Sequence, residues 1–154
     1  MASDMVTTGF HGVEMAHVTG ASTVVVMGIG PVGLMSVAGS ALRGAGRIIA
    51  IGRRPITLEL AKEYGATDVL NYMDGPIDEQ VLELTGGVAP DCCIATGGTN
   101  DTFARCLKMV KPNGIVSNLQ AQTFDTEIPG MYTLYWQSHK QVNGGLCPGG
   151  RKRM

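Results

Sequence analysis

The chain has 154 residues and a formal net charge of −1, so it has room for one domain of ordinary size and no bulk attraction to nucleic acid or to an anionic membrane. Its composition, 44% hydrophobic and 16% charged, is globular. No run approaches about 18 apolar residues, and the first residues lack an apolar signal region. We therefore expect a cytoplasmic chain with neither nucleic acid nor membrane as a partner.

Short apolar runs alternate with stretches of helical spacing along most of the chain. The runs are continuously apolar, as is typical of strands buried on both faces. In chain order we expect a helix over 4–18, a strand over 21–27, a helix over 31–43, a strand over 47–51, a helix over 55–64, a strand over 67–70, a helix over 77–84, a strand over 91–95, a helix over 101–109, and strands over 115–119 and 140–143. This alternation predicts an α/β fold: a Rossmann-type doubly wound parallel sheet of about six strands with helices on both faces.

The stretch from Thr23 to Gly33, TVVVMGIGPVG, is an apolar strand that breaks into a GxGxxG turn and opens a helix. In this setting the pattern indicates a dinucleotide-binding loop, although a glycine-rich turn without a ligand is the alternative. Gly28 permits the turn, Gly30 lets a diphosphate approach the backbone, and Gly33 lets helix and strand pack closely. The N–H groups of the helix N-terminus favour an anion. The predicted diphosphate site comprises Gly28, Ile29, Gly30, Pro31, Val32 and Gly33.

The end of the second strand indicates which dinucleotide is bound. NAD sites usually place an acid there to accept a hydrogen bond from the ribose, but this chain has Gly52-Arg53-Arg54 and no acid until Glu59. Two arginines favour the 2′-phosphate of NADP, by roughly 10²–10⁴ over NAD if both bind it. A solvated basic loop is the alternative. The missing acid also argues against an S-adenosylmethionine methyltransferase.

Other candidate residues are less specific. Tyr72 follows the third strand, where it would either lie beside an adenine or be half-buried without a role. His11 and His17 lie six residues apart, on opposite sides of a helix, so they are not expected to share a metal ion. The four cysteines form no CxxC pair, and we expect them to be reduced: Cys92, Cys93, Cys106 and Cys147. The sequence offers no complete catalytic set, so no catalytic residue is assigned.

Five segments together resemble the coenzyme-binding domain of zinc-containing medium-chain alcohol dehydrogenases. They are most similar to the NADP-dependent secondary-alcohol dehydrogenases of anaerobic bacteria and protists. The segments are DMVTTGFHG at 4–12, GIGPVGLM at 28–35, RGAGRIIAIG at 43–52, GATDVLNY at 65–72 and GGLCPGGRKRM at 144–154. The resemblance implies an oxidoreductase that transfers hydride between secondary alcohols or ketones and NADP(H).

The resemblance also implies roles for single residues. Backbone from Gly28 to Val32 would receive the diphosphate, and Gly52, Arg53 and Arg54 the 2′-phosphate, with Tyr72 alongside. The family tends to have Ser where this chain has Arg53, a departure that would either tighten phosphate binding or crowd it. The strand end near the nicotinamide comprises Leu119, Gln120 and Ala121.

Asp4 matches the one zinc ligand that this domain supplies in the subfamily, although a helix N-cap is the structural alternative. The other zinc ligands and most of the substrate pocket would belong to a catalytic domain outside this chain. We therefore expect zinc in the full-length enzyme only, and no turnover by the chain alone. The family resemblance further implies a homo-oligomer, a tetramer in the full-length protein.

The resemblance divides the chain into three expected parts. Residues 1–20 would be a linker helix from the catalytic domain, 21–145 the dinucleotide-binding domain, and 146–154 the start of a truncated C-terminal continuation. A non-catalytic dinucleotide-binding or redox-sensing module stays open as an alternative function.

Overall fold

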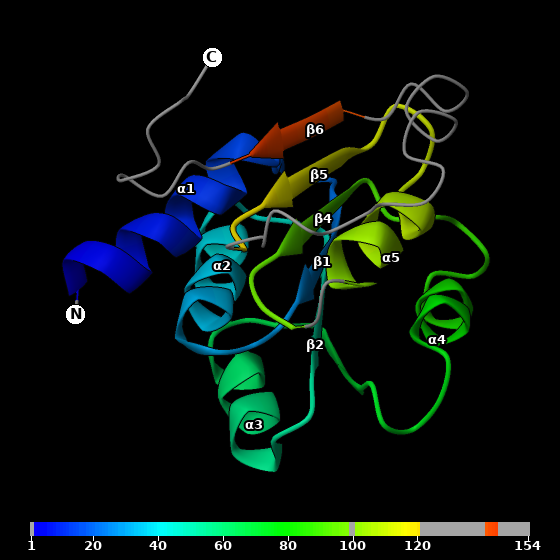
Figure 1. Ribbon diagram of the computed structural model, residues 1–154, viewed down its shortest axis with the longest axis horizontal. Helices are drawn as coiled ribbons and strands as arrows, with labels where there is room; N and C mark the ends of the chain where they lie inside the picture. The colour runs from blue at the N-terminus through cyan, green and yellow to red at the C-terminus, as the bar shows by residue number, and fades with distance from the viewer. Residues whose placement is uncertain (1, 99–100, 121–140, 145–154) are drawn as a thin grey trace.

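The computed structural model of the chain describes residues 2–98, 101–120 and 141–144 (Figure 1). The expected part 146–154, Cys147 and Ala121 lie outside these residues. None of the helices in the described ranges combines the length and apolar character needed to cross a membrane.

Helices and strands alternate along the chain as the sequence predicts. In order they are a π-helical turn at Ala2–Val6, α1 (Thr7–Met15), β1 (Thr23–Met27), α2 (Pro31–Leu42), β2 (Arg47–Gly52), α3 (Pro55–Glu63), β3 (Asp68–Asn71), α4 (Ile77–Leu84), β4 (Cys92–Ala95), α5 (Asp101–Met109), β5 (Ile115–Asn118) and β6 (Gln141–Gly144). The sheet has six strands in the order β3-β2-β1-β4-β5-β6. Every neighbouring pair is parallel, which confirms the predicted doubly wound sheet.

Most element boundaries differ from the expected ones by one to a few residues, and two of these differences are described here. The first strand begins at Thr23 rather than at residue 21, because residues 19–22 form a turn. The N–H of Ser22 donates to the backbone oxygen of Thr19, and the N–H of Thr19 donates to the hydroxyl oxygen of Ser22. The sixth strand is Gln141–Gly144 rather than 140–143, and its register pairs Gln141 with Ile115 of β5. Both differences leave the topology unchanged.

The alternative of Asp4 as a helix N-cap is wrong. Asp4 lies inside the π-helical turn, and Val6 occupies the N-cap position of α1 without a side-chain cap. The hydroxyl of Thr7 donates to the backbone oxygen of Asp4 at 3.1 Å, so the main chain and not the carboxylate is used there. The helix also ends at Met15, short of residue 18.

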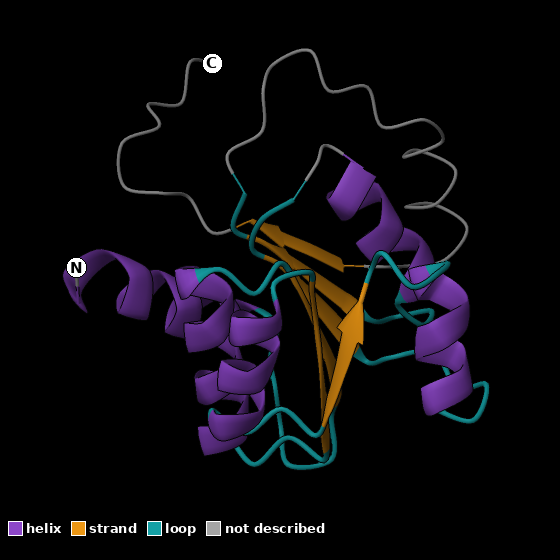
Figure 2. Cartoon of the chain, turned by 90° about the horizontal axis from the view of Figure 1, so that it is seen from below, coloured by secondary structure: helices purple, strands orange, loops and turns teal. Residues whose placement is uncertain are grey.

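Helices cover both faces of the sheet (Figure 2), and the strands divide their side chains between two cores. Along β1, Val25 and Met27 face a core shared with α4 and α5, while Val24 and Val26 face a core shared with α1, α2 and α3. This alternation follows from the period of two in a strand, and it explains why the strands are apolar throughout.

The first helix is held against the second by close backbone contact. A Cβ on Gly9 would lie 2.5 Å from the Cβ of Met35 and 2.7 Å from the backbone oxygen of Val32. The hydroxyl of Ser36, which is fully buried, donates to the backbone oxygen of Gly9 at 3.1 Å. Glycine is therefore required for the two helices to approach this closely, and α1 lies against the first two turns of α2.

Ion pairs join the strands at the amino-terminal edge of the sheet. Arg47 Nε donates to Asp68 Oδ2 at 2.8 Å, linking β2 to β3. Asp91 accepts from the backbone N–H of Thr23 at 2.7 Å and pairs with Lys111, so the starts of β1, β4 and β5 are also connected. These contacts lie at the end of the sheet that is away from the glycine loop.

Removing core volume on β4 should cost far more stability than the same change on the surface. Ile94 is completely buried, so Ile94→Ala is expected to lower the free energy of unfolding by about 2–5 kcal/mol. Ile56 is 62% exposed, and Ile56→Ala should change it by no more than about 0.5 kcal/mol. Urea unfolding of both variants measures the difference, and equal midpoints would contradict the assignment of β4 to the core.

The Arg47–Asp68 pair predicts a loss of stability in acid. The hydrogen bond from Arg47 holds the pKa of Asp68 below its usual value. The stabilisation is therefore complete above a carboxyl pKa of about 4 and is lost as pH falls through the lower folded pKa. The urea midpoint of unfolding should fall less steeply between about pH 5 and pH 2 in Asp68→Asn than in the unmodified chain. Glu59→Gln on the exposed surface of α3 is the control and should leave that slope as it is.

Candidate dinucleotide-binding site

The candidate site lies at the point in the sheet where the strand order changes direction, between β1 and β4. Strand β1 has β2 on one side and β4 on the other, so connections leave in opposite directions at the carboxyl ends of β1 and β4. In doubly wound sheets this switch point is where ligands bind. Gly28 follows β1 here, and Thr96 follows β4.

The turn after β1 fits only glycine. Gly28 has a φ of +93°, and a Cβ there would lie 2.4 Å from the backbone oxygen of Gly97. Thr96 fixes the opposite side, because its hydroxyl donates to the backbone oxygens of Met27 and Gly28. A Cβ on Gly33 would lie 2.0 Å from the Gly28 oxygen, so α2 also packs directly on this turn.

Gly30 differs from the other two glycines of the motif. It is exposed, has extended backbone angles that any residue adopts, and would place a Cβ at least 4 Å from the atoms of the chain. The fold therefore gives no internal reason for glycine at this position. Gly30 is the N-cap of α2 and forms no side-chain cap, and Pro31 follows at the first helical position. A helix N-terminus kept open in this way leaves room for an anionic group to reach the backbone.

Ile29 lies between the glycines but points inward. Its side chain is only 4% exposed and belongs to the core shared with α1, α2 and α3. A Cβ on Gly52 would lie 2.3 Å from Ile29 Cγ1, so Gly52 lets the end of β2 pack against the loop after β1. Only the backbone of Ile29 is available to a ligand, and Gly52 brings the next two residues close to the loop.

Arg53 and Arg54 follow directly, and both side chains are exposed. Arg54 is also the N-cap of α3, where its backbone oxygen accepts from the hydroxyl and N–H of Thr57. Neither guanidinium forms an ion pair within the described ranges. Tyr72 is brought to the same edge by its N–H, which donates to the Gly52 oxygen at 3.1 Å, and its side chain is 47% exposed. The predicted phosphate-binding residues therefore lie together.

The residues after β5 occupy the other side of the switch point. The N–H of Leu119 donates to the oxygen of Ala95 at 2.8 Å, while its side chain fills the space left by Gly12 of α1. Gln120 is half-buried, its backbone N–H donates to Asn118 Oδ1 at 3.1 Å, and its side-chain Nε2 has no hydrogen-bond partner in the described part of the chain. Gln120 thus keeps a side-chain donor free for a ligand, whereas the Leu119 side chain is used in packing.

Asp4 is exposed at the start of the helix that leads to Gly9. Four residues of helix lie between Asp4 and Gly9, which are roughly 7 Å apart along the axis, and Gly9 lies against the first two turns of α2. Among the residues that the structure describes, no three His, Cys, Asp or Glu side chains gather as a metal site. His11 lies 3.9 Å from Glu14, one helical turn away. Asp4 therefore supplies a single carboxylate.

Thr96 and Gly97 have no role in the prediction from the sequence, which ends the fourth strand at residue 95. In the structure, both form one wall of the Gly28 turn. Strand order was the signal, because β4 must lie next to β1 in a doubly wound sheet and its end must then meet the glycine loop.

Residues 31–150 match the family model described as "Zinc-binding dehydrogenase". The chain is 52% identical to the NADP-dependent isopropanol dehydrogenases of Thermoanaerobacter brockii and Clostridium beijerinckii. These alignments cover 100% and 99% of the chain but 44% of each relative, so the chain spans less than half the length of these relatives.

Among solved structures, the alcohol dehydrogenase TADH from Thermus sp. ATN1 superimposes with a TM-score of 0.83 at 28% identity, over 94% of this chain and 41% of that one. The resemblance drawn from the five sequence segments is confirmed. Together with the match over most of its length, these similarities show that the chain belongs to the zinc-binding dehydrogenase family.

Proposed function

We propose that this chain is the NADP-binding part of a dehydrogenase that interconverts secondary alcohols and ketones. The observation that carries the proposal is the pairing of an open helix N-terminus at Gly30 with two exposed arginines at the end of β2. The names of the relatives support it, since both of the 52% identical proteins are NADP-dependent isopropanol dehydrogenases.

The backbone of the loop would hold the diphosphate. The N–H groups at the start of α2 and the positive end of its dipole favour the negative charge, and the bare Gly30 admits it. On the other side of the switch point, the free Nε2 of Gln120 would donate to the nicotinamide end, with Leu119 and Ala121 beside it.

Arg53 and Arg54 would bind the 2′-phosphate, with Tyr72 alongside. The arginines are exposed and within the described ranges pair with no carboxylate, so binding a phosphate breaks no ion pair. A charge-assisted contact of this kind contributes about 1.5–3 kcal/mol. NAD lacks the phosphate, so the same contacts produce cofactor preference rather than general affinity.

Asp4 would contribute one ligand to a zinc ion in a longer protein. Its carboxylate is exposed, and carboxylate oxygen is an ordinary zinc ligand, but a zinc site needs at least three protein ligands. The others, and most of the pocket for the alcohol, would come from outside this chain. When bound, NADP⁺ supplies the hydride acceptor, and zinc supplies Lewis acidity toward the alcohol oxygen.

The remaining features of the proposal concern the longer protein. We propose that it is a cytoplasmic homo-oligomer, a tetramer, whose partners are NADP(H) and a secondary alcohol or ketone. The expected division into 1–20, 21–145 and 146–154 belongs to the same proposal. The chain alone would bind the dinucleotide without turning over an alcohol.

Calorimetry of the chain with NADP and NAD tests the arginine pair. NADP should bind more tightly, and Arg54→Ala should lower its affinity about 10- to 100-fold while changing NAD affinity less than about 3-fold. Arg53→Ala should act in the same direction. Arg43→Ala, an exposed arginine at the end of α2, is the matched control and should leave both affinities unchanged. Equal affinity of the unmodified chain for NAD and NADP would contradict the proposal, as would binding of S-adenosylmethionine in their place.

Gly30→Ala separates ligand contact from folding. Its Cβ meets no atom of the chain within 4 Å, so the free energy of unfolding should fall by no more than about 1 kcal/mol. The same methyl group would stand where the diphosphate approaches, and NADP affinity should fall at least about 10-fold. Gly20→Ala, another exposed glycine with room for a Cβ, should keep full affinity. Unchanged NADP affinity in Gly30→Ala would show that the diphosphate lies elsewhere.

A further inference from the structure

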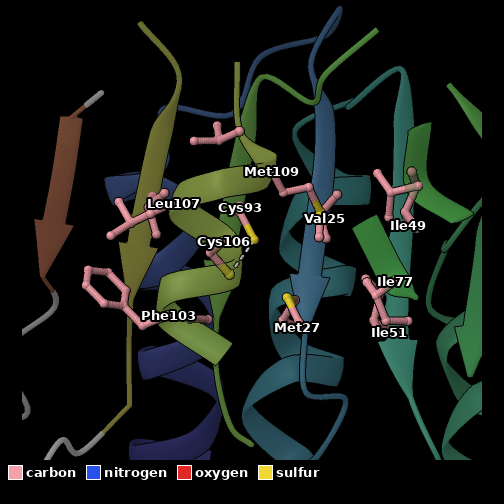
Figure 3. Close-up of a cluster of buried hydrophobic side chains, with 14 residues drawn as sticks. Val25, Met27, Ile49, Ile51, Ile77, Cys93, Phe103, Cys106, Leu107 and Met109 are labelled. Atoms are coloured by element: carbon pink, nitrogen blue, oxygen red, sulfur yellow. Dashed lines mark hydrogen bonds between the residues drawn. The ribbon is translucent and has the colours of Figure 1, made fainter. Parts of the chain in front are cut away.

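Two cysteine sulfurs meet inside the core between the sheet and α5. Cys93 lies on β4 and Cys106 on α5, and their Sγ atoms are 2.7 Å apart (Figure 3). The thiol of Cys93 donates a hydrogen bond to Cys106 Sγ, and this separation is longer than the ~2.05 Å of bonded sulfurs. The two sulfurs are therefore direct partners in the core, and Figure 3 shows them pointing toward each other.

The pairing is selective among the cysteines that the structure describes. Cys92 precedes Cys93 on β4, so its side chain emerges on the opposite face of the sheet and lies in the other core. Cys93 and Cys106 share one core with Val25, Met27 and Phe103, which leaves Cys92 no route to Cys106 in the folded chain.

The surroundings keep this pair protected at rest. Both residues are completely buried. Burial, reinforced by the contact with Cys106 and by the nearby Cys92 and Asp78, raises the pKa of Cys93 well above its ordinary value, so its thiol stays protonated. Reaction then depends on transient opening of α5, a helix of nine residues, away from the sheet.

We propose that Cys93 and Cys106 are a redox pair that a peroxide converts into a disulfide linking β4 to α5. The peroxide oxidises one thiol to a sulfenic acid, with cleavage of the O–O bond and release of one water or alcohol molecule. The second sulfur attacks the first, the S–S bond forms, the S–O bond breaks, and the departing hydroxide takes the second thiol proton to leave as water. Two electrons pass from the sulfurs to the peroxide.

The disulfide would fasten α5 to the strand that supports the dinucleotide loop. Strand β4 continues into Thr96 and Gly97, which form the wall of the Gly28 turn. A link between residues 13 apart restricts the unfolded chain, so the oxidised form should be harder to unfold. The bond forms on the side of the sheet opposite to α1 and α2, and thus does not cover the open N-terminus of α2.

Peptide mapping of the 154-residue chain tests the proposal directly. The Cys92→Ala variant is treated with hydrogen peroxide, its free thiols are blocked with iodoacetamide, and it is cut with trypsin without reduction. Cleavage after Lys62, Arg105 and Lys108 leaves Cys93 in peptide 63–105 and Cys106 in peptide 106–108. The expected product is these two peptides joined, about 2 Da lighter than their sum and separated by a thiol reductant.

Thermal unfolding provides the second measurement. Peroxide treatment should raise the melting temperature of the unmodified chain and of Cys92→Ala by about 5–10 °C, reversibly. Cys93→Ala and Cys106→Ala should lose this rise, and if either fails to fold, the peptide map of Cys92→Ala decides alone. Recovery of peptide 106–108 with its cysteine alkylated or converted to sulfinic or sulfonic acid overturns the proposal, as does a bond from Cys106 to any cysteine other than Cys93.

Discussion

The contact between the ends of β1 and β4 is the constraint on which the site depends. The backbone of Gly28 and that of Gly97 approach so closely that a Cβ on Gly28 does not fit. Because β1 is paired with both β2 and β4, this contact fixes the position of the turn within the sheet. Gly33 packs on the same turn and so sets the position of the N-terminus of α2.

The three glycines of the GxGxxG motif have different structural roles, which the sequence pattern alone does not distinguish. Gly28 and Gly33 are required by the chain itself, since a side chain at either would collide with backbone. Gly30 is required by nothing in the described chain. The proposed diphosphate would account for a glycine at this position, where the fold leaves room for a larger residue.

The predictable features are those that depend on local pattern. Continuous apolar runs predicted the parallel strands, and the Arg53-Arg54 pair at the end of β2 was found from its spacing to the glycines. Contacts that depend on how distant segments meet were not predictable from pattern. The packing of Gly9 on Met35 and the approach of Cys93 to Cys106 are of this kind, because they require helix positions that only the assembled sheet sets. Residue 121 and most of the segment to 144 lie outside the described chain.

In the proposed function, cofactor binding and the chemistry of the reaction are separable. The switch point, the open helix end and the arginine pair all belong to one sheet edge and to residues of this chain. Asp4, by contrast, gives one carboxylate where a zinc ion needs several ligands. Asp4 is carried by the helical segment that Gly9 holds against the first two turns of α2, the helix that begins at the proposed dinucleotide loop, so this packing also sets where that carboxylate lies. A change at the contact between α1 and α2 would therefore disturb both Asp4, the proposed metal ligand, and the proposed diphosphate site.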